Sequence, residues 1–137
     1  MKKSWLFISV IMVGTVFIVS QIVGCLRQGN TDHVVLEYGD SLKFSKAEIQ
    51  AAADCVLEEF KSFKDCDLQK LWYDEEVANR EYGVNDVKGI VLLSNFHVGA
   101  SGGDGGFESN AEMNEWQWLI ERDSRTAEWR LVSWGYA

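Results

Sequence analysis

Residues 115–136 constrain the fold of this chain more than any other segment. They include four of the six tryptophans of the 137-residue sequence. Two runs of strand-favouring residues flank the polar, turn-forming residues 123–127, which predicts an antiparallel hairpin with a long loop. A sheet with such an apolar hairpin needs a second layer of structure to cover it.

The pairing register of this hairpin depends on where its turn closes. If Arg122 pairs with Glu128, Trp118 lies opposite Val132. A register shift of one residue would move these side chains to the opposite face of the hairpin. The face that carries Trp118 is expected to meet the covering layer. The other face is a candidate surface for a binding partner, because it presents Leu119, Trp129 and Leu131.

Residues 45–63 carry the clearest helical pattern. Ser45 and Glu48 have the spacing of a capping box, and Phe44 with Ile49 has that of a hydrophobic staple. Apolar residues then recur at intervals of three and four, which draws a single stripe along one side of a helix. The stripe consists of Ile49, Ala52, Ala53, Val56, Leu57, Phe60 and Phe63.

Three further segments read as strands: residues 33–38, 67–73 and 87–98. In the last of these, Ile90, Leu92, Phe96 and Val98 share the face expected to meet the helix. Asp74, Glu75 and Glu76 could suggest a metal or acid–base site, but an N-cap followed by an acidic first helical turn accounts for them. The pattern predicts one α+β domain over residues 34–137, with a long N-terminal helix packed on a curved antiparallel sheet.

The first 24 residues have the pattern of an export signal. Lys2 and Lys3 form a basic start, residues 5–23 are almost entirely apolar, and Cys25 follows Ile-Val-Gly, which resembles a bacterial lipobox. Cys25 is therefore a candidate lipidation site, and residues 25–33 would be a short tether. The alternative is an uncleaved membrane anchor, since the uncharged run is just long enough to cross a bilayer. Either reading places the domain on the extracytoplasmic face of the cell membrane.

The charge of the chain argues against nucleic acid as a partner. Lys2 and Lys3 are the only charged residues before Cys25, so 11 of the 13 basic residues and all 21 acidic residues follow it, a net charge of −10. Such a domain repels polyanions.

Two cysteines remain after Cys25, and two readings of them stay open. Cys55 lies on the flank of the predicted helix and Cys66 just beyond it, so the chain could bring them together as a disulfide in an oxidising compartment. Two separate, partly buried thiols are equally consistent with the sequence. No basic residue pattern around either cysteine indicates a catalytic thiolate.

The glycine-rich residues 99–114 are the candidate binding loop. They carry Asp104, Phe107 and Glu108 and have no basic residue, and loops of this length in a small domain are usually functional or mobile. A flexible connection and a weak cation site are the two other interpretations. His97 has no second ligand at metal-binding spacing, so no metal and no cofactor is expected.

Five phrases of the sequence together resemble a group of small, uncharacterised lipoproteins of Gram-positive bacteria. They are residues 70–76, 90–96, 101–105, 116–118 and 134–136. The domain of these lipoproteins is similar to the nuclear-transport-factor-like and cystatin-like folds. Some enzymes with the former fold, such as the ketosteroid isomerase-like ones, place an acid or base in a conical pocket. The resemblance would make Tyr73, Asp74 and His97 the candidates for that role here.

Two functions follow from these patterns. The first is a tethered extracytoplasmic domain that binds a protein or small molecule without catalysis, because no nucleophile–base constellation is visible. The alternative is a small-molecule lyase, isomerase or hydrolase with a buried acid or base. A deep apolar cavity around an ionisable group would favour the enzyme, and an interior filled by Trp and Phe would favour the binding domain.

Overall fold

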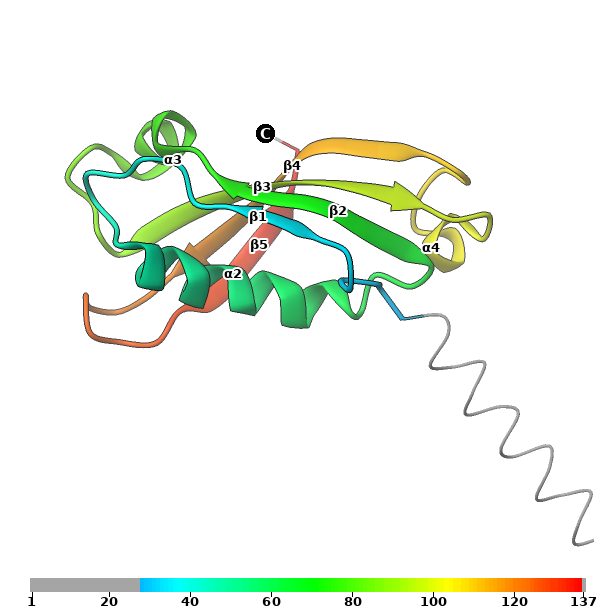
Figure 1. Cartoon of the computed structure of the whole chain (residues 1–137), viewed down its shortest axis with the longest axis horizontal. Helices are drawn as coiled ribbons and strands as arrows, with labels where there is room; N and C mark the ends of the chain where they lie inside the picture. Colours follow the sequence, from blue (N-terminus) through cyan, green and yellow to red (C-terminus); the bar gives the residue numbers. More distant parts are fainter. Residues whose placement is uncertain (1–27, 137) are drawn as a thin grey trace, which may run out of the picture.

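A five-stranded sheet and a helix across it form the body of the computed structural model, which describes residues 28–136 (Figure 1). The predicted signal and Cys25 lie outside these residues. The strand order is β1-β2-β3-β4-β5. The elements are β1 Val35–Glu37, α2 Lys46–Phe60, β2 Cys66–Tyr73, α3 Glu75–Tyr82, β3 Gly89–Val98, α4 Gly102–Gly105, β4 Glu112–Glu121 and β5 Arg130–Gly135.

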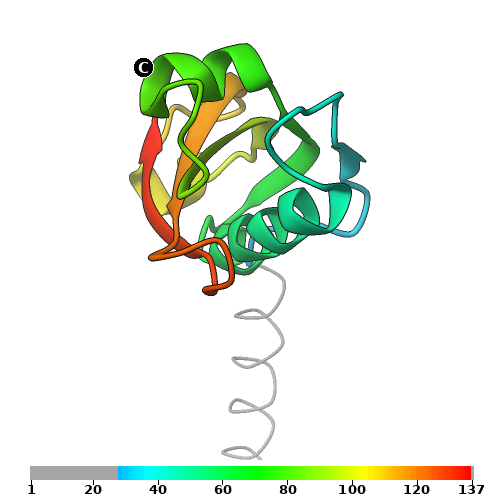
Figure 2. The same cartoon turned by 90° about the vertical axis from the view of Figure 1, so that its left-hand side faces the viewer.

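The α+β class is confirmed, but the sheet is not purely antiparallel. β1 runs parallel to β2, while every later pair is antiparallel. β1 and β2 are parallel because α2 forms a crossover between them, which returns the chain to the end of the sheet where β1 begins. Figure 2 shows α2 on one side of the sheet and α3 on the other.

The start of α2 follows the local sequence signals. The backbone N–H of Glu48 donates to Ser45 Oγ at 3.2 Å, and that of Ser45 donates to Glu48 Oε2 at 2.8 Å, which completes the capping box. The helix ends at Phe60, three residues earlier than predicted. Phe63 therefore lies in the turn that follows the helix, not in its last turn.

The acidic triplet is a helix start, as predicted. Asp74 Oδ1 accepts hydrogen bonds from the backbone N–H groups of Glu76 at 3.0 Å and Val77 at 3.2 Å. These bonds satisfy two of the donors that every helix leaves unpaired at its N-terminus. Asp74 is thus an N-cap of α3, and this role needs no metal.

β3 is buried on both faces, whereas the sequence indicated one. Ile90, Leu92, Phe96 and Val98 are buried as expected, but Val91 and Leu93 on the other face are buried as well. The reason is α3, which packs against β3 on the side away from α2. A strand that is covered on both faces carries apolar residues at successive positions and does not alternate between apolar and polar residues.

The hairpin forms, but the predicted register is wrong. Trp118 pairs with Trp134, not Val132, and Ile120 pairs with Leu131. Two features cause the shift: the connecting loop is longer than predicted, from residue 122 to 129, and Val132 is an extra residue that forms a bulge in β5. The bulge leaves Val132 half exposed.

Candidate functional site

The space between α2 and the sheet is filled by aromatic rings. Phe63 is the centre of this cluster, and its ring centroid lies 5.2 Å from that of Phe60, 5.2 Å from Trp118 and 5.8 Å from Phe96. Trp118 is fully buried, and its indole N–H donates to the buried Ser94 Oγ at 2.8 Å. The three ring pairs are stacked, tilted and edge-to-face in turn, and all lie at favourable separations.

The cluster continues to the surface beyond the end of α2 as four rings, which we call the aromatic surface: Phe107, Trp116, Trp134 and Tyr136. The ring centroid of Trp116 lies 5.1 Å from that of Tyr136 and 5.8 Å from that of Phe107. Trp134 lies 5.9 Å from Phe63 on the same side of the sheet. The exposed fractions of Trp134 and Tyr136 are 45% and 60%, although both residue types usually bury most of their area.

The three residues expected on a free face of the hairpin do not share a face. The bulge pairs Leu131 with Ile120, which places it on the side of Trp118, while Leu119 pairs with Ser133 and Val91. All three residues, Leu119, Trp129 and Leu131, are partly buried against the core, and the ring of Trp129 lies 5.9 Å from that of Phe44. The exposed aromatic residues lie instead on the face predicted to meet the helix. α2 stops short of them because it ends at Phe60.

The candidate binding loop is organised by its own contacts, and only part of it is available to a ligand. Asp65 accepts hydrogen bonds from the backbone N–H of Ser101 at 3.0 Å and from its Oγ at 2.6 Å. Asp104 lies 3.6 Å from Lys64 Nζ. Phe107 packs into the aromatic surface and Glu108 is exposed. The loop thus contributes the Phe107 ring and the exposed Glu108 carboxylate to this end of the molecule.

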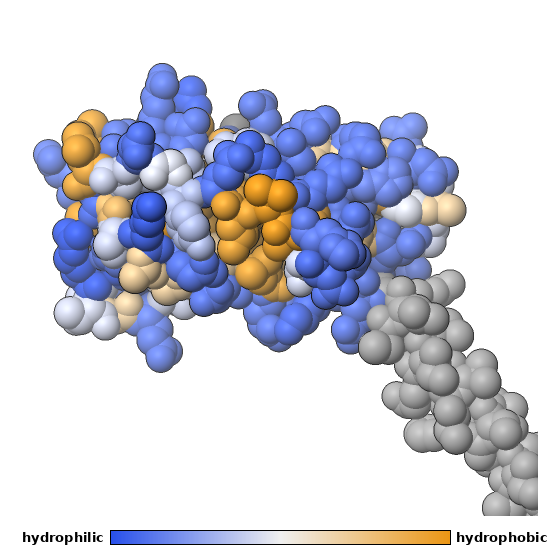
Figure 3. All heavy atoms as spheres, viewed as in Figure 1, coloured by the Kyte–Doolittle hydropathy of each residue, from blue (hydrophilic) through white to orange (hydrophobic). Residues whose placement is uncertain are grey.

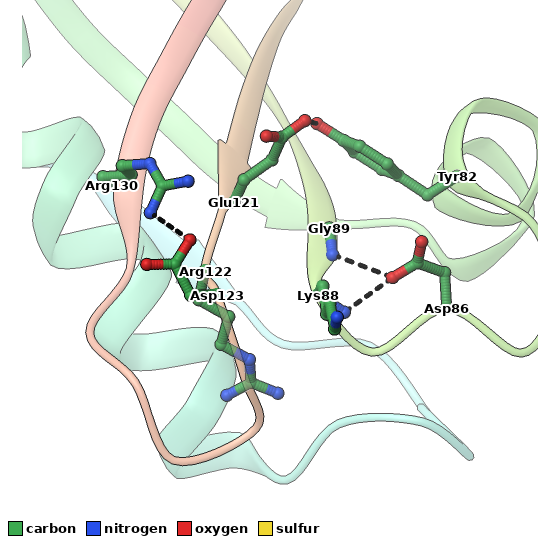
Figure 4. Close-up of a pocket in the computed structure, with 8 residues that line it drawn as sticks. All are labelled: Tyr82, Asp86, Lys88, Gly89, Glu121, Arg122, Asp123 and Arg130. Atoms are coloured by element: carbon green, nitrogen blue, oxygen red, sulfur yellow. Dashed lines mark hydrogen bonds and ion pairs between the residues drawn. The ribbon is translucent and has the colours of Figure 1, made fainter.

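A polar pocket of about 330 Å³ lies at the opposite end of the sheet (Figure 4). It is lined by Tyr82, Asp86, Lys88, Gly89, Glu121, Arg122, Asp123 and Arg130. The Tyr82 hydroxyl donates to Glu121 Oε1 at 3.2 Å, and Arg130 Nη1 lies 2.9 Å from Asp123 Oδ1. Burial and the neighbouring Glu121 carboxylate raise the pKa of Tyr82, which favours the protonated phenol. Glu121 and Asp123 thus each have a partner among the lining residues.

Arg122 is the most buried charged side chain of the described residues. Its Nε donates to the Val87 carbonyl at 3.0 Å and its Nη2 to Glu48 Oε1 at 2.9 Å, while its guanidinium carbon lies 4.0 Å from the Trp129 ring centroid. No local sequence pattern indicates this contact, because Glu48 precedes Arg122 by 74 residues. The pair links the start of α2 to the β4–β5 loop.

The three residues suggested by the nuclear-transport-factor resemblance are not brought together. Tyr73 and His97 lie at opposite ends of the β2–β3 pair. Burial raises the pKa of Tyr73 to about 12, and its hydroxyl lies 3.4 Å from Glu75 Oε1. His97 Nδ1 lies 2.6 Å from Glu112 Oε1 on an exposed part of the sheet, and Asp74 caps α3.

Cys55 and Cys66 are two free thiols in the structure, not a disulfide. Cys55 Sγ lies 3.5 Å from the Trp129 carbonyl oxygen, whereas Cys66 Sγ lies 3.5 Å from that of Lys64. The early end of α2 is the reason, because the turn after Phe60 carries Cys66 into β2. Burial raises the pKa of both thiols, that of Cys66 to about 11, which disfavours the reactive thiolate.

The face of the molecule seen in Figure 3 is mostly hydrophilic, with its broadest apolar patch over β1 and the middle of α2 and smaller apolar spots toward the ends. β1 carries Val35, which is 55% exposed. This patch is the second candidate for a contact surface.

No protein family model, curated protein or solved structure matches this chain. Within residues 28–136, no helix is both long and apolar enough to cross a membrane. The same residues contain no group of three or more His, Cys, Asp or Glu side chains placed to hold a metal ion.

Proposed function

We propose that this chain is a membrane-tethered, extracytoplasmic binding domain that engages its partner through the aromatic surface and performs no catalysis. The observation that carries the proposal is the contrast between a filled interior and an open aromatic end. Phe60, Phe63, Phe96 and Trp118 occupy the space where a fold of this kind could hold a substrate. Trp134 and Tyr136 remain half exposed next to them.

Two further observations support binding over chemistry. His97 lies at the far end of the β2–β3 pair from Tyr73 and Asp74, and each of the three has a partner that accounts for its position. Exposed clusters of large aromatic residues are enriched at protein interfaces, since Trp and Tyr bury much area at a small cost in side-chain entropy. The arrangement of one helix across a curled sheet also favours a nuclear-transport-factor-like or cystatin-like assignment for the domain.

The proposed contact is tested by photo-crosslinking on intact cells. A benzophenone amino acid at Tyr136 should give a discrete adduct with another protein, because this ring is 60% exposed at the edge of the aromatic surface. The same label at Val35, which is 55% exposed in β1, is the matched control and should give none. Adducts from Val35 alone would assign the contact to the apolar patch, and none from either position would remove the proposal.

The proposed tether is tested by changing Cys25→Ser. A lipobox cysteine supplies the thiol that receives the lipid, so the variant should lose all labelling by a fatty-acid probe and keep its full precursor mass. Labelling is read by gel fluorescence and the mass by spectrometry. Normal processing of Cys25→Ser would show that this cysteine is not the anchor, and an unlabelled wild-type chain of full length would favour the uncleaved membrane helix.

A further inference from the structure

We propose that the aromatic surface binds a lysine- or arginine-bearing segment of another protein, with a cationic side chain held against the ring faces. This inference rests on the proposed binding function and deepens it by naming the chemistry of the partner. A protein segment fits better than a small molecule because Trp134 and Tyr136 are 45% and 60% exposed, whereas small-molecule sites bury most of their ligand.

The arrangement of the rings suits a cation. The Trp116 ring meets that of Tyr136 at an interplanar angle of 72° and that of Phe107 at 70°, so it stands nearly perpendicular to each of them. The face of an aromatic ring carries negative potential, and an ammonium or guanidinium within about 6 Å of it is attracted. Rings in this arrangement allow one cation to contact more than one ring face.

The chain uses this interaction elsewhere, but not here. Among the described residues, the four cation–π contacts place Lys43, Lys70 and Arg122 over the rings of Phe44, Trp72 and Trp129. None of those rings belongs to the aromatic surface. The faces of Trp134 and Tyr136 are therefore left for a base that comes from outside the described chain.

The charge around the rings has the sign that a basic partner needs. Residues 99–116, which supply Phe107 and Trp116, carry four acidic residues and no lysine or arginine: Asp104, Glu108, Glu112 and Glu115. Glu108 and Glu115 directly neighbour the two rings in sequence and are exposed. Lys64, the base that reaches this segment, is already beside Asp104. Such a patch attracts a basic segment and steers its approach.

The experiment is a titration of the full-length protein, in mild detergent, with a fluorescent oligolysine peptide. The matched ligand is the same peptide with every side-chain amine acetylated, which keeps the length and removes the charge. We expect oligolysine to bind and the acetylated peptide to bind at least tenfold more weakly. Equal affinity for the two peptides would overturn the inference.

Two variants distinguish the contribution of the Tyr136 ring to oligolysine binding from that of the overall negative charge of the domain. Tyr136→Leu keeps an apolar side chain and the net charge but removes the ring, and it should weaken oligolysine binding roughly three- to tenfold. Tyr136→Phe keeps the ring face and should bind like the wild type. If Tyr136→Leu binds like the wild type, or Tyr136→Phe loses as much as Tyr136→Leu, the ring face is not the site.

Different results would overturn the proposed binding function and the inference of a basic partner. If crosslinks from Tyr136 persist on cells while oligolysine and its acetylated form bind alike, the surface is a contact site for an uncharged partner and only this inference falls. If the protein loses oligolysine binding when moved into phosphatidylcholine vesicles, the rings are buried in lipid, which overturns it as well. Absence of any crosslink from Tyr136 removes the binding function itself.

Discussion

Trp118→Ala is expected to lower the free energy of unfolding by about 3–5 kcal/mol. The side chain is fully buried between Phe63 and Trp134, so its removal leaves a cavity that the surrounding rings cannot fill without moving. The change also leaves Ser94 Oγ, itself buried, without the indole N–H that now donates to it at 2.8 Å. Urea titration followed by far-ultraviolet circular dichroism measures the loss.

Two comparison variants divide this loss between packing and hydrogen bonding. Trp118→Phe keeps an aromatic ring in the interior but removes the donor and part of the side-chain volume, so it should cost about 1–3 kcal/mol, less than Trp118→Ala. Trp134→Ala, at a 45% exposed position that pairs with Trp118, should cost less than Trp118→Ala. A loss below about 1 kcal/mol for Trp118→Ala would mean that the interior is loosely packed.

Glu48→Gln is expected to cost about 3 kcal/mol, because it leaves the buried Arg122 guanidinium without its carboxylate. The side chain of Arg122 is only 3% exposed, and its Nη2 lies 2.9 Å from Glu48 Oε1. Glutamine can still accept a hydrogen bond within the capping box, so the charge is the main loss. Glu58→Gln is the control, since Glu58 pairs with Lys61 on an open surface and should contribute less than about 1 kcal/mol.

The same pair makes the stability dependent on pH in a defined direction. Partial burial opposes ionisation of Glu48, but hydrogen bonds from the Ser45 backbone and from Arg122 outweigh it and lower the pKa of Glu48 below its usual 4.5. A carboxyl group with a lowered pKa stabilises the fold fully above its unfolded pKa and loses that contribution as the pH falls through the folded one. The stability difference between wild type and Glu48→Gln should therefore shrink below about pH 4.5. A difference that grows on acidification would contradict the role of the pair.

Elements set by neighbouring residues could be predicted from the sequence, and contacts between distant segments could not. The capping box at Ser45 and the N-cap at Asp74 act over three residues, and both helices begin where predicted. The predicted hairpin register is wrong because the bulge at Val132 depends on tertiary packing, and the local sequence pattern does not indicate it. The burial of Val91 depends on α3, whose position no residue of β3 encodes.

The candidate site was harder to predict than the fold for the same physical reason. Phe107 was identified from the sequence as part of a binding loop, and four tryptophans were assigned to the hairpin. Their junction at Phe63 was not predicted, because Phe63 was placed in the last turn of a helix that in fact ends three residues earlier. The aromatic surface combines rings from a loop, β4 and the end of β5, and only the tertiary structure brings these segments to one place.

The first described residues decide how a tethered domain would stand on a bilayer. The Gly29 N–H donates to the Lys61 carbonyl at 3.1 Å, and Asn30 is bonded to Cys66 and Asp67, so the predicted tether is fastened to the sheet by residue 30. Figure 1 shows this attachment beside the C-terminal end of α2, on the α4 side of the molecule. Three residues lie between Cys25 and Gly29, so the extended chain from one to the other spans at most about 14 Å. If Cys25 carries a lipid, the α4 end of the molecule, with Phe107, lies nearest the membrane and the polar pocket lies farther out. The C-terminus, next to Tyr136, lies on the opposite side of the molecule from this attachment in Figures 1 and 2, so a partner can reach that ring without entering the layer of solvent just above the lipid headgroups.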